Sequence, residues 1–471
     1  MSDTIKKKIA IGVEDFKTII NKNGYFVDKT LMIQSLIESQ AMVTLFMRPR
    51  RFGKTLNMSM LNCFFSHQYA ERADLFEGLS VWEKEDYRAI QGKYPVIFLS
   101  FADVKQDNYR DAIYKIKKII ANVYQQFHEI GRSEALTEVQ RRQFMNVTAD
   151  MDDVIAQSAL QDLSYYCYLY YGRKAIILLD EYDTPMQEAY IHDYWDKFTS
   201  FVRGLFNSTF KTNPYLERAL MTGITRISKA SIFSDLNNLV VITATSERYA
   251  ECFGFTEKEV FQALELFDLG EQKSSVKAWY DGFIFGNHRD IYNPWSICNF
   301  LDRGKLISYW INTSSNKIIG DIIRRHPVRS KFEIERLMAG EVVHKKINEN
   351  ITFQYMDGDE NSLWSLFLAI GYIKADYVVK HGEITECDVS VTNQEVMSMF
   401  RNEILGMFDN GNLYYNEFIR ALLAHNTEEM EDILLDITYS SMSYFDTGTS
   451  SKRNPENFFH GLVLGLIVSL K

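Results

Sequence analysis

Residues 41–55 read AMVTLFMRPRRFGKT, an apolar run that passes into a basic loop. A short apolar run that stops at Arg-Pro is typical of a buried strand. The next ten residues, LNMSMLNCFF at 56–65, carry apolar side chains at helical spacing. Gly53-Lys54-Thr55 therefore stands between a strand and a helix, which is the context required for the end of a GxxxxGK[ST] phosphate loop.

The residue types in this loop suit a nucleotide phosphate. Backbone N–H groups and the N-terminus of the following helix attract anions, and Gly53 allows the phosphate to come close to the backbone. Lys54 can reach the β- and γ-phosphates, and the Thr55 hydroxyl can bind Mg²⁺. Arg48 replaces the first glycine of the general pattern, and Pro49 removes one N–H donor. The alternative is a basic turn that caps a helix.

We expect the nucleotide contacts to come from the whole loop, in which two further arginines add positive charge, and from a strand that follows later in the chain. The predicted contacts are Arg48, Pro49, Arg50, Arg51, Phe52, Gly53, Lys54, Thr55, Leu56 and Thr222.

A second apolar strand, AIILL at 175–179, ends in Asp180 and Glu181. An acidic strand end downstream of a phosphate loop is the Walker B arrangement. It predicts that Asp180 holds Mg²⁺ with Thr55, and that Glu181 orients or deprotonates the attacking water. Asp183 is a further catalytic candidate, and mutual repulsion among these carboxylates favours a bound cation. The alternative is a solvated acidic turn.

A further strand at 218–224 runs into Thr225 and Arg226. In a phosphate-loop sheet, the strand beside the Walker B strand ends near the γ-phosphate. Thr222, Thr225 or Arg226 are therefore candidate sensors, and we choose Arg226 for the charge of the transition state. The alternative for Arg226 is a surface arginine on a loop.

Apolar strands alternate with long helices in the first half of the chain, which predicts an α/β fold with a parallel sheet. The segments are strands at 41–47, 95–101, 175–179 and 218–224, and helices at 109–127, 152–171 and 194–210. We divide the chain into a nucleotide-binding core (1–260), a lid of helices and aromatic loops (261–330), and a mostly helical middle domain (331–440). The middle domain has an expected strand pair at Val342–Phe353 and a turn at Met356–Asp359.

Composition limits the partners and the compartment. The chain has 471 residues and a formal charge of −10, so it has no global attraction for nucleic acid or an anionic membrane. The basic segment Ile323–Lys331 is a candidate local patch for nucleic acid, or a solvated helix end.

Five dispersed cysteines argue against disulfides and a zinc site. The longest late apolar run, Gly461–Leu470, is half a membrane span. We therefore expect a cytoplasmic protein.

Several motifs together resemble the AAA-ATPase-like family of bacterial proteins. They are YFVDKT (25–30), MRPRRFGKTLNMSML (47–61), LLDEYDTP (178–185), MTGITRISKASIFSDLNNL (221–239), CFGFTEKEV (252–260), WYDGFIFG (279–286) and IYNPWSI (291–297). The resemblance implies a P-loop ATPase of the AAA type, with ATP at Arg48–Thr55 and Mg²⁺ or catalysis at Asp180 and Glu181. Arg48 is normal for that family.

The family typically adds a C-terminal nuclease domain of the PD-(D/E)XK superfamily, and residues 441–471 look like its opening. The Asp and Glu-x-Lys that such a nuclease needs do not follow before Lys471. We therefore expect this chain alone not to cut nucleic acid by that site. We expect the apolar segment Phe458–Leu470 to dock on residues 363–440 or on a second copy of the chain.

Three functions remain open from the sequence. The first is an ATPase whose Mg²⁺-dependent hydrolysis acts as a switch for a C-terminal nuclease-like module or a partner protein. The second is a scaffold that binds ATP without turnover. The third is a nucleic-acid-processing enzyme whose nuclease half is absent. Glu181 favours the first, because a general base has a use only in hydrolysis.

Overall fold

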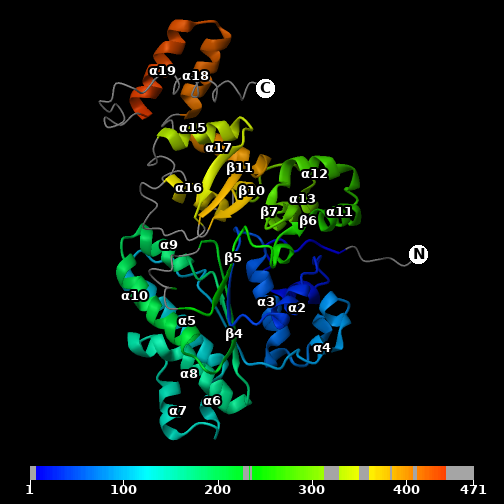
Figure 1. Ribbon diagram of the computed structural model, residues 1–471, viewed down its shortest axis with the longest axis vertical. Coiled ribbons are helices and arrows are strands. Elements are labelled where there is room, and N and C mark those ends of the chain that lie inside the picture. Colours follow the sequence, from blue (N-terminus) through cyan, green and yellow to red (C-terminus); the bar gives the residue numbers. More distant parts are fainter. Residues whose placement is uncertain are drawn as a thin grey trace, which may run out of the picture.

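The computed structural model describes residues 7–225, 233, 236–311, 328–348, 360–381, 384–406 and 411–441 (Figure 1). Its strands are β1 (Val43–Met47), β2 (Val96–Ser100), β3 (Ala175–Asp180), β4 (Leu216–Gly223), β5 (Leu239–Ile242), β6 (Phe255–Thr256), β7 (Phe283–Phe285), β8 (His288–Tyr292), β9 (Val343–Ile347), β10 (Ile373–His381) and β11 (Ile384–Val391). Its α-helices are α1 (Phe16–Asn21), α2 (Leu31–Glu38), α3 (Lys54–Phe65), α4 (Glu85–Arg88), α5 (Tyr109–Gln126), α6 (His128–Arg132), α7 (Glu138–Met145), α8 (Asp153–Tyr171), α9 (Thr184–Ile191), α10 (Trp195–Phe206), α11 (Glu257–Leu266), α12 (Lys273–Tyr280), α13 (Pro294–Arg303), α15 (Val328–Met338), α16 (Glu360–Ile370), α17 (Gln394–Gly406), α18 (Gly411–Leu423) and α19 (Thr427–Ser441).

The central sheet has five strands in the order β2-β3-β4-β1-β5, and every pair in it is parallel. All five residues of β1 and all six of β3 are buried, as expected of strands with helices on both faces. The predicted α/β class is confirmed. Strand β4 lies between β1 and β3, so its carboxyl end stands between the phosphate loop and the acidic strand end.

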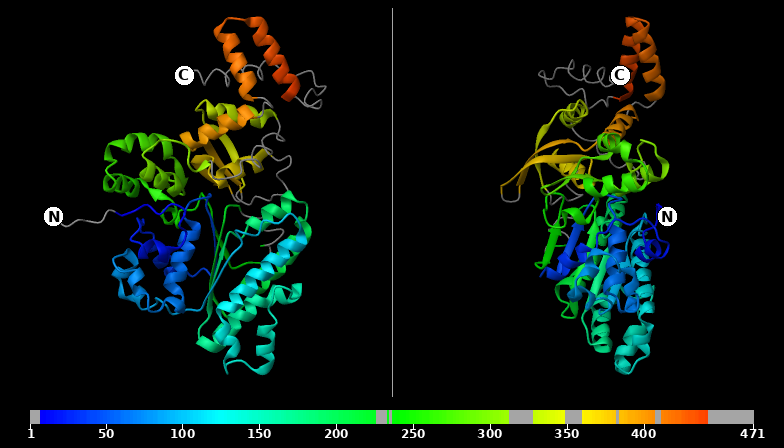
Figure 2. Two further views of the ribbon diagram at one scale, coloured as in Figure 1. Left: turned by 180° about the vertical axis from the view of Figure 1, so that it is seen from behind. Right: turned by 90° about the vertical axis from the view of Figure 1, so that its right-hand side faces the viewer.

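Alternation along the strands divides the core into two layers. Leu45, Ile177 and Met221 belong to the cluster that α5, α8 and α10 cover, whereas Phe46 and Leu178 belong to the cluster beneath α1, α2 and α3. Figures 1 and 2 show these two groups of helices on opposite sides of the sheet. Helix α10 ends at Phe206, and a π-helical turn, Asn207–Lys211, completes the helix that we predicted to run to Phe210.

A second, three-stranded sheet follows, with antiparallel strands in the order β6-β8-β7. Helices α11, α12 and α13 pack together beside it around their own buried cluster. Thr256 and Glu259 form a capping box at the start of α11. Strand β6 lies before residue 260, so the element that opens this unit falls inside the segment that we predicted as core.

The third sheet, in the order β10-β11-β9, is also antiparallel and packs with α15, α16 and α17 (Figure 1). The strand pair that we expected at Val342–Phe353 is tested only in its first half: β9 lies there and pairs with β11, about forty residues later in the chain, whereas residues 349–353 lie outside the described residues. Such long-range pairing leaves no local signal in the sequence. The expected turn at Met356–Asp359 and all of residues 442–471 lie outside the described residues. Within the described ranges, no helix combines the length and apolarity needed to span a bilayer.

Candidate nucleotide site

The loop between β1 and α3 has the shape that the sequence predicts. Strand β1 ends at Met47 and α3 begins at Lys54, with Gly53 in a left-handed conformation (φ 78°) as its N-cap residue. A Cβ atom added at Gly53 would meet no atom within 4 Å, so the backbone is open at this point. The loop therefore presents a helix N-terminus next to free space, as phosphate binding requires.

Lys54 is the first residue of α3, and its side chain is buried against the loop. Its Nζ donates hydrogen bonds to the carbonyl oxygens of Arg48 (3.1 Å) and Pro49 (3.0 Å). Burial lowers the pKa of Lys54, and the carboxylates of Glu181, Asp183 and Asp180 oppose that shift. The lysine thus lies within electrostatic reach of the whole acidic strand end.

Asp180 joins three elements of the core. One carboxylate oxygen accepts a hydrogen bond from the Thr55 hydroxyl at 2.8 Å, and the other accepts one from the Thr222 hydroxyl. Burial raises the pKa of Asp180, while the two hydroxyl donors lower it. The structure therefore brings together both predicted Mg²⁺ ligands, Thr55 and Asp180, with Thr222 of β4 beside them.

Glu181 occupies a left-handed backbone conformation (φ 50°), which is uncommon for a residue with a side chain. Its N–H donates to the Thr222 hydroxyl at 3.2 Å, and its carboxylate accepts a hydrogen bond from the Thr184 hydroxyl at 3.0 Å. These contacts fix the backbone and the carboxylate of the predicted general base at the end of β3.

Asp183 has a different environment from the one we expected of a catalytic carboxylate. One of its oxygens accepts hydrogen bonds from the N–H groups of Ile224 (2.9 Å) and Thr225 (3.0 Å) and from the Thr225 hydroxyl (3.1 Å). Burial raises the pKa of Asp183, and the two backbone donors lower it. Asp183 thus ties the end of β3 to the loop after β4, and we place it among the positioning residues. Arg226 lies outside the described residues, as do Ile323–Pro327 of the basic segment.

Arg48 is buried, with none of its surface exposed. Its guanidinium donates to the carbonyl oxygens of Thr243 (2.7 Å) and Tyr249 (3.5 Å), and it lies 4.4 Å from the centre of the Phe285 ring. The side chain of Arg48 therefore contacts the segment after β5 and strand β7. This corrects the expectation that it contacts phosphate, although its carbonyl does contact Lys54.

Arg51 and Phe52 connect the loop to the second sheet. The Arg51 guanidinium lies 4.5 Å from the centre of the Trp295 ring and 3.4 Å from a carboxylate oxygen of Glu14. Phe52 is buried, and its ring centre lies 4.7 Å from that of Phe283. These contacts connect the phosphate loop to the second sheet and its helices.

The remaining loop residues have three different surroundings. A Cβ atom at Gly371, in the turn between α16 and β10, would lie 3.0 Å from Pro49, so the third unit touches the loop. Arg50 is exposed and donates to the Gln187 side-chain oxygen at 3.3 Å. Leu56 packs against the core cluster beneath α3.

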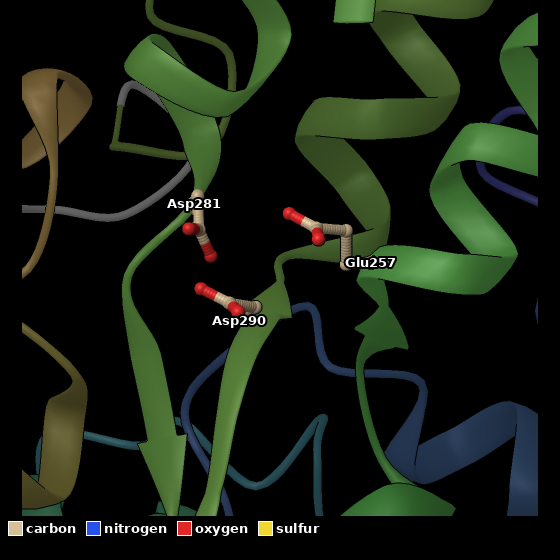
Figure 3. Close-up of side chains that lie close together, drawn as sticks. All are labelled: Glu257, Asp281 and Asp290. Atoms are coloured by element: carbon tan, nitrogen blue, oxygen red, sulfur yellow. The ribbon is translucent and has the colours of Figure 1, made fainter. Parts of the chain in front are cut away.

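The structure adds one acidic cluster that the sequence did not reveal. Glu257, Asp281 and Asp290 place carboxylate oxygens within 4.8 Å of one another (Figure 3). Lys277 pairs with all three, at 3.8 Å from Asp281 and 3.5 Å from Asp290. The lysine already supplies a positive charge to this cluster, whose members come from three separate segments and so form no motif.

The parallel strand order, with a loop after β1 that carries Lys54 and an acidic end on β3, is consistent with the fold of a P-loop nucleoside triphosphatase. A family model described as predicted AAA-ATPase matches residues 10–233, so this region of the chain is similar to that family. An uncharacterized protein in the vnfD 5′ region of Azotobacter chroococcum mcd 1 is 25% identical over 402 residues, which make up 85% of this chain and 70% of the relative. No solved structure matches the chain.

Proposed function

We propose that this protein binds ATP together with Mg²⁺, hydrolyses it to ADP and phosphate, and uses the nucleotide state as a switch for its C-terminal units or for a partner that binds them. One observation carries the proposal. Asp180 bonds at once to Thr55 of the phosphate-loop helix and to Thr222 of β4, so one carboxylate connects the loop, the acidic strand and the sensor strand.

The residues present fit the magnesium complex of a nucleotide. Mg²⁺ prefers oxygen ligands, and Asp180 and Thr55 offer a carboxylate and a hydroxyl 2.8 Å apart. The backbone at Gly53 is open, and the Lys54 ammonium lies on the loop's own carbonyls. A phosphate oxygen is a stronger acceptor for an ammonium than these neutral carbonyls, because it carries negative charge opposite the positive charge of the donor.

Each residue of the site then has a defined task. Mg²⁺ supplies positive charge to the β- and γ-phosphates when it is bound. Lys54 turns from the carbonyls of Arg48 and Pro49 to the phosphates, and Asp180 and Thr55 provide ligands for the cation. Glu181, oriented by Thr184, accepts the proton of the attacking water. Asp183 holds the loop after β4 next to the end of β3 through its hydrogen bonds to the backbone of that loop.

Contacts of the phosphate loop outside the core support the switch. Arg48 reaches Phe285 of β7, Phe52 reaches Phe283, and Pro49 lies against Gly371 of the third unit. A change in the loop on hydrolysis would therefore alter contacts with both C-terminal sheets. A switch needs such differential contacts between its two states.

Phosphate release with Mg²⁺ and ATP tests the proposal. Glu181→Gln should bind ATP as the wild type does and release phosphate at least about 10²-fold more slowly, the usual scale for a lost general base. Glu188→Gln is the matched control, since Glu188 lies on the adjacent helix α9 and pairs with His192. ATP binding without release that depends on Glu181 would contradict hydrolysis and favour the scaffold. Slow release by Asp183→Asn with a silent Glu181→Gln would mean that Asp183 is the base.

A further inference from the structure

Arg50 and Arg51, which lie next to each other in the phosphate loop, differ in the contacts that their side chains make. Arg51 has a stacking partner in Trp295 and an ionic partner in Glu14. Arg50 is exposed, and its guanidinium donates at 3.3 Å to the neutral side-chain oxygen of Gln187. A neutral acceptor on the surface leaves the charge of Arg50 uncompensated by that contact, so Arg50 can turn to an anion at little cost.

The backbone of Arg50 is nevertheless fixed. Its carbonyl oxygen accepts a hydrogen bond at 3.4 Å from the side chain of Asn293. Asn293 is completely buried and caps the N-terminus of α13, where it accepts from the N–H groups of Trp295 and Ser296. A buried capping residue on another unit thus anchors the loop at the position from which the Arg50 side chain extends.

The contact with Gln187 places Arg50 at the catalytic edge of the sheet. Gln187 lies in α9, directly after the acidic strand end, and donates to Asp183 at 3.3 Å. Asp183 in turn holds the loop after β4, where γ-phosphate sensors are expected. The positive charge of Arg50 also contributes to the lowered pKa of Lys54, whose largest cause is burial. Arg50 and Lys54 therefore act on the same small region.

We propose that Arg50 is a catalytic residue that stabilises the transferring γ-phosphoryl group from within the same chain, the task that the sequence suggested for Arg226. This inference rests on the proposed function. In the step, the water oxygen bonds to the γ-phosphorus while the bond to the bridging oxygen breaks and its electron pair leaves on ADP. The proton of the water passes to Glu181. Negative charge grows on the bridging oxygen and is shared by the γ-oxygens, and a guanidinium there stabilises it.

Nucleotide titrations test the proposal apart from turnover. With Mg²⁺, the wild type should bind ADP plus aluminium fluoride, a planar mimic of the transferring group, more tightly than ADP alone. Arg50→Ala should keep its affinity for ADP and lose about 10²-fold or more in affinity for the mimic, with a similar loss of turnover. Arg50→Lys should recover part of the loss, because lysine keeps the positive charge but lacks the planar guanidinium that can donate two parallel hydrogen bonds. Arg51→Ala should change both affinities by the same factor.

The outcomes separate this inference from the proposed function. A wild type that hydrolyses ATP and prefers the mimic, with an Arg50→Ala variant that does the same, overturns the role of Arg50 alone. Equal loss of ADP and mimic affinity in Arg50→Ala overturns it too, since that pattern means ground-state binding. A wild type with neither turnover nor preference for the mimic overturns the proposed function and this inference with it.

Discussion

The basic side chains of the phosphate loop differ more in their surroundings than in their sequence. Arg48 is buried against Phe285, Arg51 lies on Trp295, and Lys54 bonds to the loop's own carbonyls. Only the lysine sits where the motif alone would place it. Phe285 and Trp295, whose rings lie against the two arginines, come roughly 240 residues further along the chain, so spacing within the loop cannot distinguish an anchor from a phosphate contact.

Arg48→Met tests whether that arginine is a structural anchor. The variant keeps a long unbranched side chain but leaves the buried carbonyls of Thr243 and Tyr249 without this donor, so the free energy of unfolding should fall by about 2–4 kcal/mol. Arg50→Met is the control, because Arg50 is exposed, and it should change that free energy by no more than about 0.5 kcal/mol. Urea unfolding measures both. Unchanged stability of Arg48→Met with weaker nucleotide binding would instead make Arg48 a phosphate contact.

At the scale of elements, four of the five strands of the central sheet, β1 to β4, could be predicted because each combines a short apolar run with a clear stop, whereas β5 was not predicted. Helix α11 begins at Glu257 because the Thr256 side chain caps it and the Glu259 side chain completes the capping box. The β9–β11 pairing could not be predicted, because it joins segments separated by α16 and β10. The phosphate loop and the acidic strand end were predictable because short-range chemistry dictates them. The hydrogen bonds that the Asp183 carboxylate accepts from Ile224 and Thr225 could not be predicted, because the fold alone brings the end of β4 next to Asp183.

The hairpin of β7 and β8 carries a pH-dependent element. Burial, together with a hydrogen bond and repulsion from Asp290, raises the pKa of Asp281 to about 7 from its ordinary 3.8. The folded protein therefore binds a proton that the unfolded chain has lost over this range. The stability that Asp281 contributes is complete below about pH 4 and is lost as the pH rises through 7.

Asp281→Asn removes this titration, so its stability relative to the wild type should increase between pH 5 and pH 8. Urea unfolding at the two pH values measures the difference, and Asp150→Asn, at an exposed position, serves as the control. A difference between Asp281→Asn and the wild type that stays constant with pH, or falls, would contradict the raised pKa.

At the scale of the whole molecule, the phosphate loop is the point where three units meet. The core supplies its strand and helix, the second sheet supplies Phe283 and Phe285, and the turn before β10 supplies Gly371. Figure 2 shows the two smaller sheets above the same end of the central sheet. A nucleotide at the loop would thus be sensed by residues far beyond the core in sequence.

Gly371→Ala tests whether the third unit, which contacts the phosphate loop at Pro49, influences nucleotide binding. Gly371 has a φ of 85°, and a Cβ there would lie 2.7 Å from Phe283 and 3.0 Å from Pro49, so the variant should push on the loop and weaken ATP binding. Gly340→Ala is the matched control, because Gly340 has a φ of 86° but open space around its Cβ position. Both variants should lose roughly 1 kcal/mol or more of stability from backbone strain. Calorimetric titration should show weaker ATP binding only for Gly371→Ala, and equal affinities would contradict the coupling.

Titration of ATP with Mg²⁺ into the wild type and Lys54→Ala tests the central claim most directly. Lys54 is the residue that exchanges loop carbonyls for phosphate, and a lost charge-assisted hydrogen bond costs about 1.5–3 kcal/mol, with the loop's own order lost in addition. The account predicts binding by the wild type and no measurable binding by a folded Lys54→Ala variant. Equal ATP affinity of the two proteins would contradict the assignment of this loop as the nucleotide site.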